Sequence, residues 1–200
     1  MIRARVPASL CAPLLFGAAL AMAADTVAVE GSDVTFPTTI SRTVAGKPIE
    51  LVITGTGLRE KAWFNVYVIA SYVAKGAGVA SAQELAQANV PKVLELVMER
   101  DVDGDDMAEA FEDAIRLNYP APRFEAQLAQ FRAYFDPKEA QEGKKITFTH
   151  EPGLGVRAEI EGATPVVVAD PAFAKAVWEI YLGPKNVSDD IKRGLTSRLR

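Results

Sequence analysis

Hydrophobic and polar residues alternate along several short segments of this chain, and apolar residues recur at helical spacing in longer ones. Turn-length connections join most of the alternating segments, and no regular strand–helix–strand repeat is present. The alternation predicts strands at residues 33–36, 49–54, 63–73, 92–100, 146–150, 155–161 and 164–169. The helical spacing predicts helices at residues 81–89, 105–117, 123–135, 170–182 and 188–199.

This order of elements predicts an α+β fold, with an antiparallel sheet and helices gathered on one of its faces. Capping residues support the helix starts, because Ser81 begins a capping box and Ser188 is a good N-cap. Asp170 is another N-cap and is followed by a first-turn proline. The length beyond the N-terminal segment suits one domain better than two. We therefore expect a single domain at residues 24–200.

Residues 1–23 are expected to be a cleavable secretory signal peptide. Arg3 and Arg5 form a basic start, an uncharged apolar stretch follows, and the segment ends in Ala-Met-Ala. The stretch is short for a membrane span, so the mature chain is expected to be soluble and not membrane-spanning. The only cysteine, Cys11, lies inside this segment, which leaves no thiol for a disulfide or a nucleophile. We expect a periplasmic or secreted protein.

The charge balance excludes some partners. Without Arg3 and Arg5, 20 of the 22 basic residues face 26 acidic ones, so the mature chain has a net charge of −6. This balance argues against nucleic acid and anionic membrane surfaces as partners. The single histidine, His150, cannot form a histidine-based metal site, and a structural role is its default. No cofactor is expected, because the glycine pairs lack the third glycine of a dinucleotide loop.

An acidic segment at residues 101–112 imitates an EF-hand calcium loop. That loop requires glycine at its sixth position, where this chain has Asp106. Acidic residues at the start of a helix are favoured by the helix dipole without any metal. We therefore predict no metal site.

The strand predicted at residues 63–73 has one uniformly apolar face and one mixed face. The mixed face includes Asn65 and Tyr67, and Arg59 lies just across a predicted turn. An arginine there could bind a carboxylate in a partly enclosed cleft. It could equally be a rim residue paired with Glu60 or with solvent, and the residues alone leave both interpretations open.

Three segments carry a resemblance to a known family. They read GTGLREKAWFNVYVIASYVA from Gly55, RDVDGDDMAEAFEDAI from Arg100 and DPAFAKAVWEIYLGPKNVSDDIKRGLTSRL from Asp170. They resemble segments of chalcone isomerase-fold proteins, and the similarity spans about residues 35–199. The resemblance implies an open-faced β-sandwich, a large antiparallel sheet covered by helices with a ligand cleft between them. Exported bacterial chalcone isomerase-like proteins are the most similar group.

The resemblance also assigns residues to the cleft. Plant enzymes of the family close a flavanone ring with an arginine, a strand threonine, a helix tyrosine and asparagine, and a late threonine or serine. Arg59 matches the arginine, whereas the other positions fall on Tyr67, Met107, Ala114 and Ile180. Replacing most of these polar groups removes the means to orient water or polarise an enone.

The leading hypothesis is a non-catalytic periplasmic protein that binds a fatty acid or a similar apolar carboxylate, as related plastid members do. Arg59 would form the salt bridge, Tyr67 would donate a hydrogen bond, and Asn65 would add a polar contact. Two alternatives are an isomerase or intramolecular lyase acting on a small phenolic or enone substrate, and a ligand-free structural or interaction module with a filled core. In the leading hypothesis the tail cavity is lined by Met107, Phe111, Ala114 and Ile180.

Overall fold

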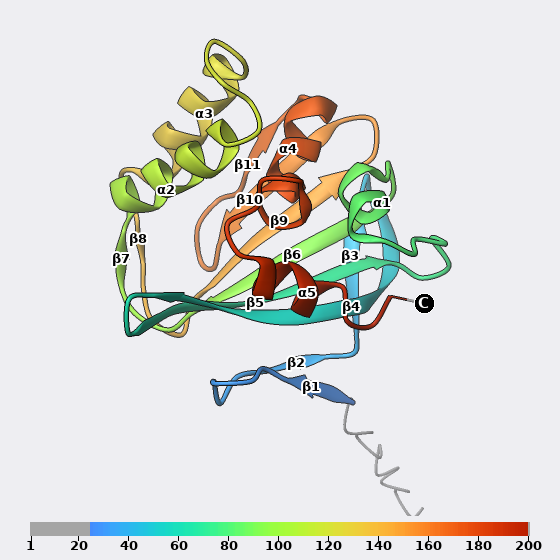
Figure 1. The fold of residues 1–200 in the computed structure, drawn as a ribbon. Coiled ribbons are helices and arrows are strands. Elements are labelled where there is room, and N and C mark those ends of the chain that lie inside the picture. The colour runs from blue at the N-terminus through green and yellow to red at the C-terminus, as the bar shows by residue number, and fades with distance from the viewer. Residues whose placement is uncertain (1–24, 200) are drawn as a thin grey trace, which may run out of the picture.

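A strongly curled antiparallel sheet of seven strands dominates the computed structural model, which describes residues 25–199 (Figure 1). The predicted signal peptide and Cys11 lie outside the described residues. The strand order is β11-β10-β9-β6-β5-β4-β3, and every neighbouring pair is antiparallel. The strands are β3 (Thr39–Val44), β4 (Lys47–Lys61), β5 (Phe64–Ala74), β6 (Lys92–Met98), β9 (Lys145–Glu151), β10 (Gly155–Ile160) and β11 (Val166–Val168).

Two short strand pairs and five helices complete the fold of residues 25–199. The pairs are β1 (Thr26–Ala28) with β2 (Thr35–Pro37), and β7 (Val102–Asp103) with β8 (Glu139–Ala140). The helices gather on one face of the sheet, whereas β1 and β2 lie on its other side (Figure 1). This arrangement confirms the predicted α+β fold. The helices are α1 (Ala82–Gln87), α2 (Gly104–Arg116), α3 (Glu125–Phe135), α4 (Pro171–Leu182) and α5 (Asp189–Leu195).

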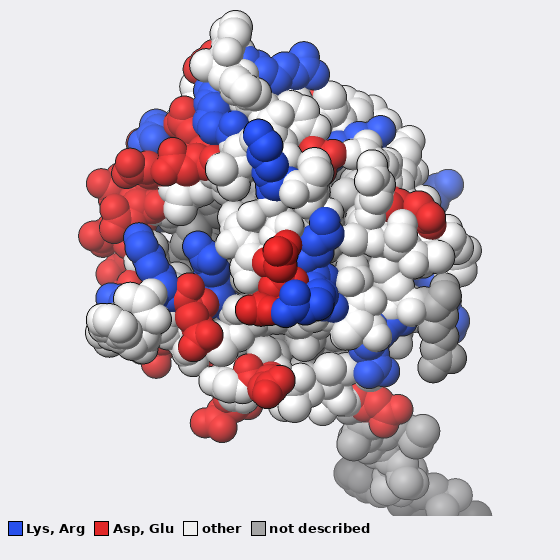
Figure 2. Space-filling model, in the orientation of Figure 1, with Lys and Arg blue, Asp and Glu red and all other residues white. Residues whose placement is uncertain are grey.

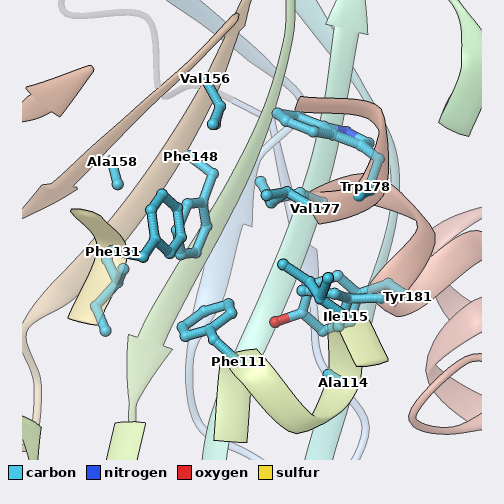
Figure 3. Packing of buried hydrophobic residues seen from close by; sticks show 14 of the residues in the cluster. Phe111, Ala114, Ile115, Phe131, Phe148, Val156, Ala158, Val177, Trp178 and Tyr181 are labelled. Carbon is cyan, nitrogen blue, oxygen red and sulfur yellow. The ribbon is translucent and has the colours of Figure 1, made fainter. Parts of the chain in front are cut away.

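The sheet separates two hydrophobic cores. The larger core fills the space between the sheet and the helices, and it contains an aromatic group in which Phe111, Phe131 and Phe148 point toward one another (Figure 3). The ring centroids of Phe111 and Phe148 are 5.0 Å apart in an edge-on arrangement. The smaller core lies on the opposite face, where Phe36 of β2 packs with Leu51 and Tyr72. Both faces of the central strands are therefore buried, which explains their nearly continuous apolar character.

Charged side chains hold the curl of the sheet together. Two strands separate β3 from β6 in the sheet order, yet Arg42 of β3 contacts Glu95 of β6 at 2.6 Å. Glu95 also contacts Lys145 of β9 at 2.8 Å, and its side chain is only 1% exposed. The two cations thus bind both oxygens of a buried carboxylate and connect three strands on the sheet face opposite the helices, called the open face below.

The longest strand differs from the prediction. The predicted strand at residues 49–54 is part of β4, which continues to Lys61, and Gly55 and Gly57 lie inside it rather than in a turn. The alternation is hidden because the two glycines have no side chains and a β-bulge follows Ile53. Strand β3 was not predicted at all, since it is short and its only apolar residues, Ile40 and Val44, are four positions apart and show no alternation.

Glu95→Gln should lower the free energy of unfolding by about 2–3 kcal/mol, because it leaves two cations without the buried carboxylate they share. Glu50→Gln is the matched control, since Glu50 pairs with Lys75 at the exposed surface, and it should change stability by less than about 1 kcal/mol. Urea unfolding of both variants measures the difference. Equal effects would contradict a structural role for the buried pair.

Candidate functional site

Arg59 and Tyr67 lie directly opposite one another on β4 and β5. Residues paired in this way across an antiparallel ladder share one face of the sheet. Tyr67 is also paired with Met98 of β6 and packs against the larger core, so this face is the one covered by helices. Both side chains are only partly exposed. The structure therefore places a cation and a phenol together at one end of the helix-covered face.

Helix α5 lies directly on β4 because three glycines let the two backbones approach. A Cβ atom at Gly55 would lie 2.0 Å from the carbonyl oxygen of Gly194, and one at Gly194 would lie 2.2 Å from that of Thr56. A Cβ at Gly57 would meet Ile191 at 3.3 Å. The glycine pattern before Arg59 therefore serves close packing of helix on strand rather than a turn or a phosphate loop.

The position of α5 on β4 determines which backbone group lies next to Arg59. The segment between α4 and α5 includes Val187, whose carbonyl oxygen accepts a hydrogen bond from Arg59 Nη1 at 3.1 Å. Arg59 forms no salt bridge with any carboxylate in residues 25–199. A guanidinium has five N–H donors, so one neutral acceptor leaves most of its capacity free. The predicted alternative of a pair with Glu60 is not what the structure shows.

A second phenol, which the sequence did not reveal as a site residue, completes the group. The hydroxyl of Tyr181 on α4 lies 3.4 Å from that of Tyr67. Burial raises the pKa of Tyr67 above its ordinary value, while the hydrogen bond with Tyr181 and the charge of Arg59 oppose the shift. Burial also raises the pKa of Tyr181 well above its ordinary value, and Tyr67 adds to this effect. Both phenols are thus protonated donors at neutral pH, beside a permanent cation.

The surface near the β4–β5 hairpin is hollowed. Figure 2 shows a recess between α2 and the β4–β5 hairpin, with basic side chains at its border and the acidic surface of α2 above it. The acidic surface corresponds to exposed residues of α2 such as Asp105, Asp106 and Glu109.

Asn65 does not belong to this group, although it was predicted to share a face with Tyr67. A β-bulge changes the register between Arg59 and Glu60, so Glu60 pairs with Asn65 and leaves Val66 as the extra residue. Successive residues of β4 point to opposite faces, and Asn65 therefore faces away from Tyr67. Its amide donates instead to the Gly31 carbonyl and to Glu99, each at 3.2 Å.

The predicted tail-lining residues lie in the packed helix-side core. Met107, Phe111 and Ala114 share the buried face of α2, and Ile180 is buried on α4. The Phe111 ring contacts three other aromatic rings, including Phe135 at a centroid distance of 5.6 Å. Two surface hollows, of about 710 and 500 Å³, have none of these residues in their walls. The lining of a cavity by these side chains stays a prediction.

His150 has a structural environment, in line with its default interpretation. It is fully buried, and its Nδ1 donates to the Val90 carbonyl at 2.8 Å. Burial lowers its pKa below the ordinary value, which favours the neutral ring. Its strand neighbour Lys92 is also buried and donates to the carbonyls of Leu85 and Ala86, each at 2.7 Å, at the end of α1.

Residues 25–199 contain no metal-binding cluster of side chains and no membrane-spanning helix. No group of three or more histidine, cysteine, aspartate or glutamate side chains in this range could hold a metal ion. The acidic segment imitating a calcium loop instead begins α2, with Asp103 in the N-cap position. Within the same residues, every helix falls short of the length and apolar character needed to cross a bilayer.

A helix-covered, curled antiparallel sheet with a cation and two phenols at one end defines an open-faced sandwich of the chalcone isomerase type. Residues 28–196 match the family described as chalcone isomerase-like, and the chain belongs to that family. The crystal structure of a fatty-acid binding protein from Arabidopsis thaliana has a similar fold, with a TM-score of 0.68 and 15% identity. The similarity covers 86% of this chain and 96% of the plant protein. A search of curated proteins returned no match.

Gly194→Ala should destabilise the protein by about 1–3 kcal/mol, because the new Cβ has no room against the Thr56 carbonyl. The direction of the change in stability is informative, since alanine stabilises a helix interior relative to glycine by about 1 kcal/mol. Gly46→Ala provides the comparison, because a Cβ there meets nothing within 4 Å although its φ is +76°. The free energy of unfolding of that variant should fall by only about 1 kcal/mol, through backbone strain. Thermal or urea unfolding distinguishes the two, and a stabilised Gly194→Ala variant would be inconsistent with close seating of α5.

Alkaline titration should show that no tyrosine ionises at its ordinary pKa while the protein is folded. Burial is the main cause that raises the pKa of all five tyrosines, to about 12 for Tyr119. A raised pKa stabilises the fold fully below the unfolded value of about 10, and this stability is lost as pH rises through the folded values. Tyrosinate absorbance should therefore rise together with loss of structure followed by circular dichroism. An ordinary titration of the folded protein would contradict the buried positions of Tyr67 and Tyr181.

Proposed function

We propose that this protein binds an apolar carboxylate such as a fatty acid, without catalysis, in the periplasm or after secretion. The observation that supports this most strongly is the convergence of Arg59, Tyr67 and Tyr181. Three donor groups gather at a partly enclosed position, and within residues 25–199 the cation has only a neutral carbonyl as its acceptor. A partly buried cation is stabilised by an anionic partner, and a carboxylate matches the planar fork of an arginine.

The protonation of the two phenols favours binding over catalysis. Because burial raises both pKa values, Tyr67 and Tyr181 are poor general bases at neutral pH and good hydrogen-bond donors. The helix positions that correspond to catalytic polar groups in the family's plant enzymes carry Met107 and Ala114, which cannot exchange protons. A site with several hydrogen-bond donors and no effective general base is suited to binding a carboxylate.

The apolar part of the ligand has to enter a region that is already packed. Met107 lies on the buried face of α2 and is an unbranched, adaptable side chain, so it is the first candidate to move aside. The recess beside α2 in Figure 2 offers an approach from the surface. The similar fold of a plant fatty-acid binding protein supports the choice of a fatty acid as the ligand class.

The packed interior favours a second candidate function, a ligand-free structural or interaction module. Buried aromatic rings from α2, α3 and β9 fill the centre of the helix-side core. In that case the Arg59 group would only hold the α4–α5 segment to β4 through Val187. The two functions differ in whether a carboxylate changes the behaviour of the protein.

Laurate should bind the protein, and Arg59→Met should weaken the binding about tenfold to a hundredfold, since a hydrogen bond to a charged group contributes about 1.5–3 kcal/mol. Isothermal titration calorimetry measures the affinity, with dodecanol as the matched ligand that lacks the carboxylate. Arg193→Met is the control variant, because it removes the same charge from an exposed position on α5, where the side chain is 72% exposed.

Two results would contradict carboxylate binding at this site. One is equal affinity of the Arg59→Met variant and the parent protein for laurate, and the other is equal affinity for laurate and dodecanol. Complete absence of binding, together with no retained lipid in native mass spectrometry of protein from its host, would favour the structural module.

A further inference from the structure

The turn between β4 and β5 presents the most exposed aromatic residues of the described chain. Trp63 is 88% exposed and Phe64 is 57% exposed, whereas every other aromatic residue in 25–199 is at least partly buried. The turn lies at one end of the sheet, away from α1 (Figure 1). Ala62 within it has a left-handed backbone with φ of 58°, an unfavourable conformation for alanine. Two adjacent aromatic rings at a protruding turn are unfavourable in water unless they have a partner.

Charged residues of both signs lie near the two rings. The guanidinium of Arg100 lies 5.4 Å from the centre of the Phe64 ring, and Lys61 pairs with Phe64 across the hairpin. Glu60 and Asp101 are exposed acidic residues next to Lys61 and Arg100 in the sequence, so charges of both signs lie beside the turn. A zwitterionic lipid headgroup offers a phosphate for the cations and an ammonium for the carboxylates. A strongly anionic surface does not match this balance.

The size of the exposed patch also distinguishes between partners. Two aromatic side chains bury about 300–500 Å² in total, whereas a stable protein interface takes roughly 800 Å² from each partner. Charged residues are depleted at the centre of protein interfaces, but charged groups beside tryptophan are usual where a protein meets the lipid headgroup region. A small aromatic tip with charged flanks therefore fits shallow insertion into a bilayer better than docking against a protein.

We propose that the β4–β5 turn is a membrane-docking element that inserts Trp63 and Phe64 into the interface of a zwitterionic bilayer. Lys61 and Phe64 share the face of Arg59 and Tyr67. Lys61 lies two residues nearer the turn than Arg59, a distance of about 7 Å along the strand, and Phe64 is its partner on β5. Docking would therefore hold the Arg59 end of the helix-covered face at headgroup depth. Membrane docking does not depend on the carboxylate site and stands or falls on its own test.

Flotation with phosphatidylcholine vesicles tests the proposal on the whole chain. The parent protein should float with the vesicles, and the double variant Trp63→Ala/Phe64→Ala should bind at least about tenfold more weakly, as expected for the loss of two buried rings. Leu154→Ala is the matched control, since Leu154 is 43% exposed in the distant β9–β10 turn and should leave binding unchanged. All variants carry the same N-terminal segment, so its contribution is common to them.

Tryptophan fluorescence reports directly on the β4–β5 turn. Trp178 is fully buried, so a blue shift and protection from acrylamide upon vesicle addition would come from Trp63. The Trp63→Phe variant should lose this spectral change and keep most of its vesicle binding. Equal binding of the double variant and the parent, or an unshielded Trp63 in the presence of vesicles, would overturn the proposal. A requirement for anionic lipid would also overturn it. So would light scattering that shows a dimer of the parent protein and a monomer of the double variant.

Discussion

The Arg59 end of the molecule depends on how closely helix α5 approaches strand β4. The contact is between backbones, because Gly55 on the strand and Gly194 on the helix leave no space for a Cβ and Gly57 leaves little. Thr54 adds a hydrogen bond from its hydroxyl to the Leu195 carbonyl at 2.8 Å. This seating fixes the end of the α4–α5 segment, and with it the carbonyl of Val187 above the guanidinium. A wider separation would move the acceptor away and open Arg59 to solvent.

The electrostatic design of the two faces differs. On the open face, the cations Arg42 and Lys145 meet a buried carboxylate and hold the curl of the sheet. On the helix-covered face, the cation Arg59 meets a carbonyl and two phenols, and no carboxylate of residues 25–199 pairs with it. In the first group the charges are paired with one another and stabilise the fold. The second group keeps hydrogen-bond donors for a ligand. That contrast is why the binding proposal rests on Arg59.

Much of the architecture could be read from the sequence. Regular periodicity and capping residues located all five helices, and Ser81, Asp170 and Ser188 act as N-caps in the structure. Only residues 49–54 of the long strand β4 were recognised, because the glycines that follow interrupt its pattern and instead allow close packing against a helix more than a hundred residues later. At the site, Arg59 and Tyr67 were found to be neighbours, but Tyr181 was missed because an aromatic residue on a buried helix face looks like ordinary core. Asn65 was misplaced since strict alternation does not allow for a bulge.

The bulge at Val66 has a consequence for comparing relatives of this protein. Because Val66 has no partner on β4, its removal would leave Arg59 opposite Tyr67 and Glu60 opposite Asn65. The hairpin can thus gain or lose one residue during evolution while its chemistry stays in place. Equivalent positions on this strand are therefore defined by their partners across the ladder, and counting residues forward from the glycines would match Tyr67 with the wrong neighbour.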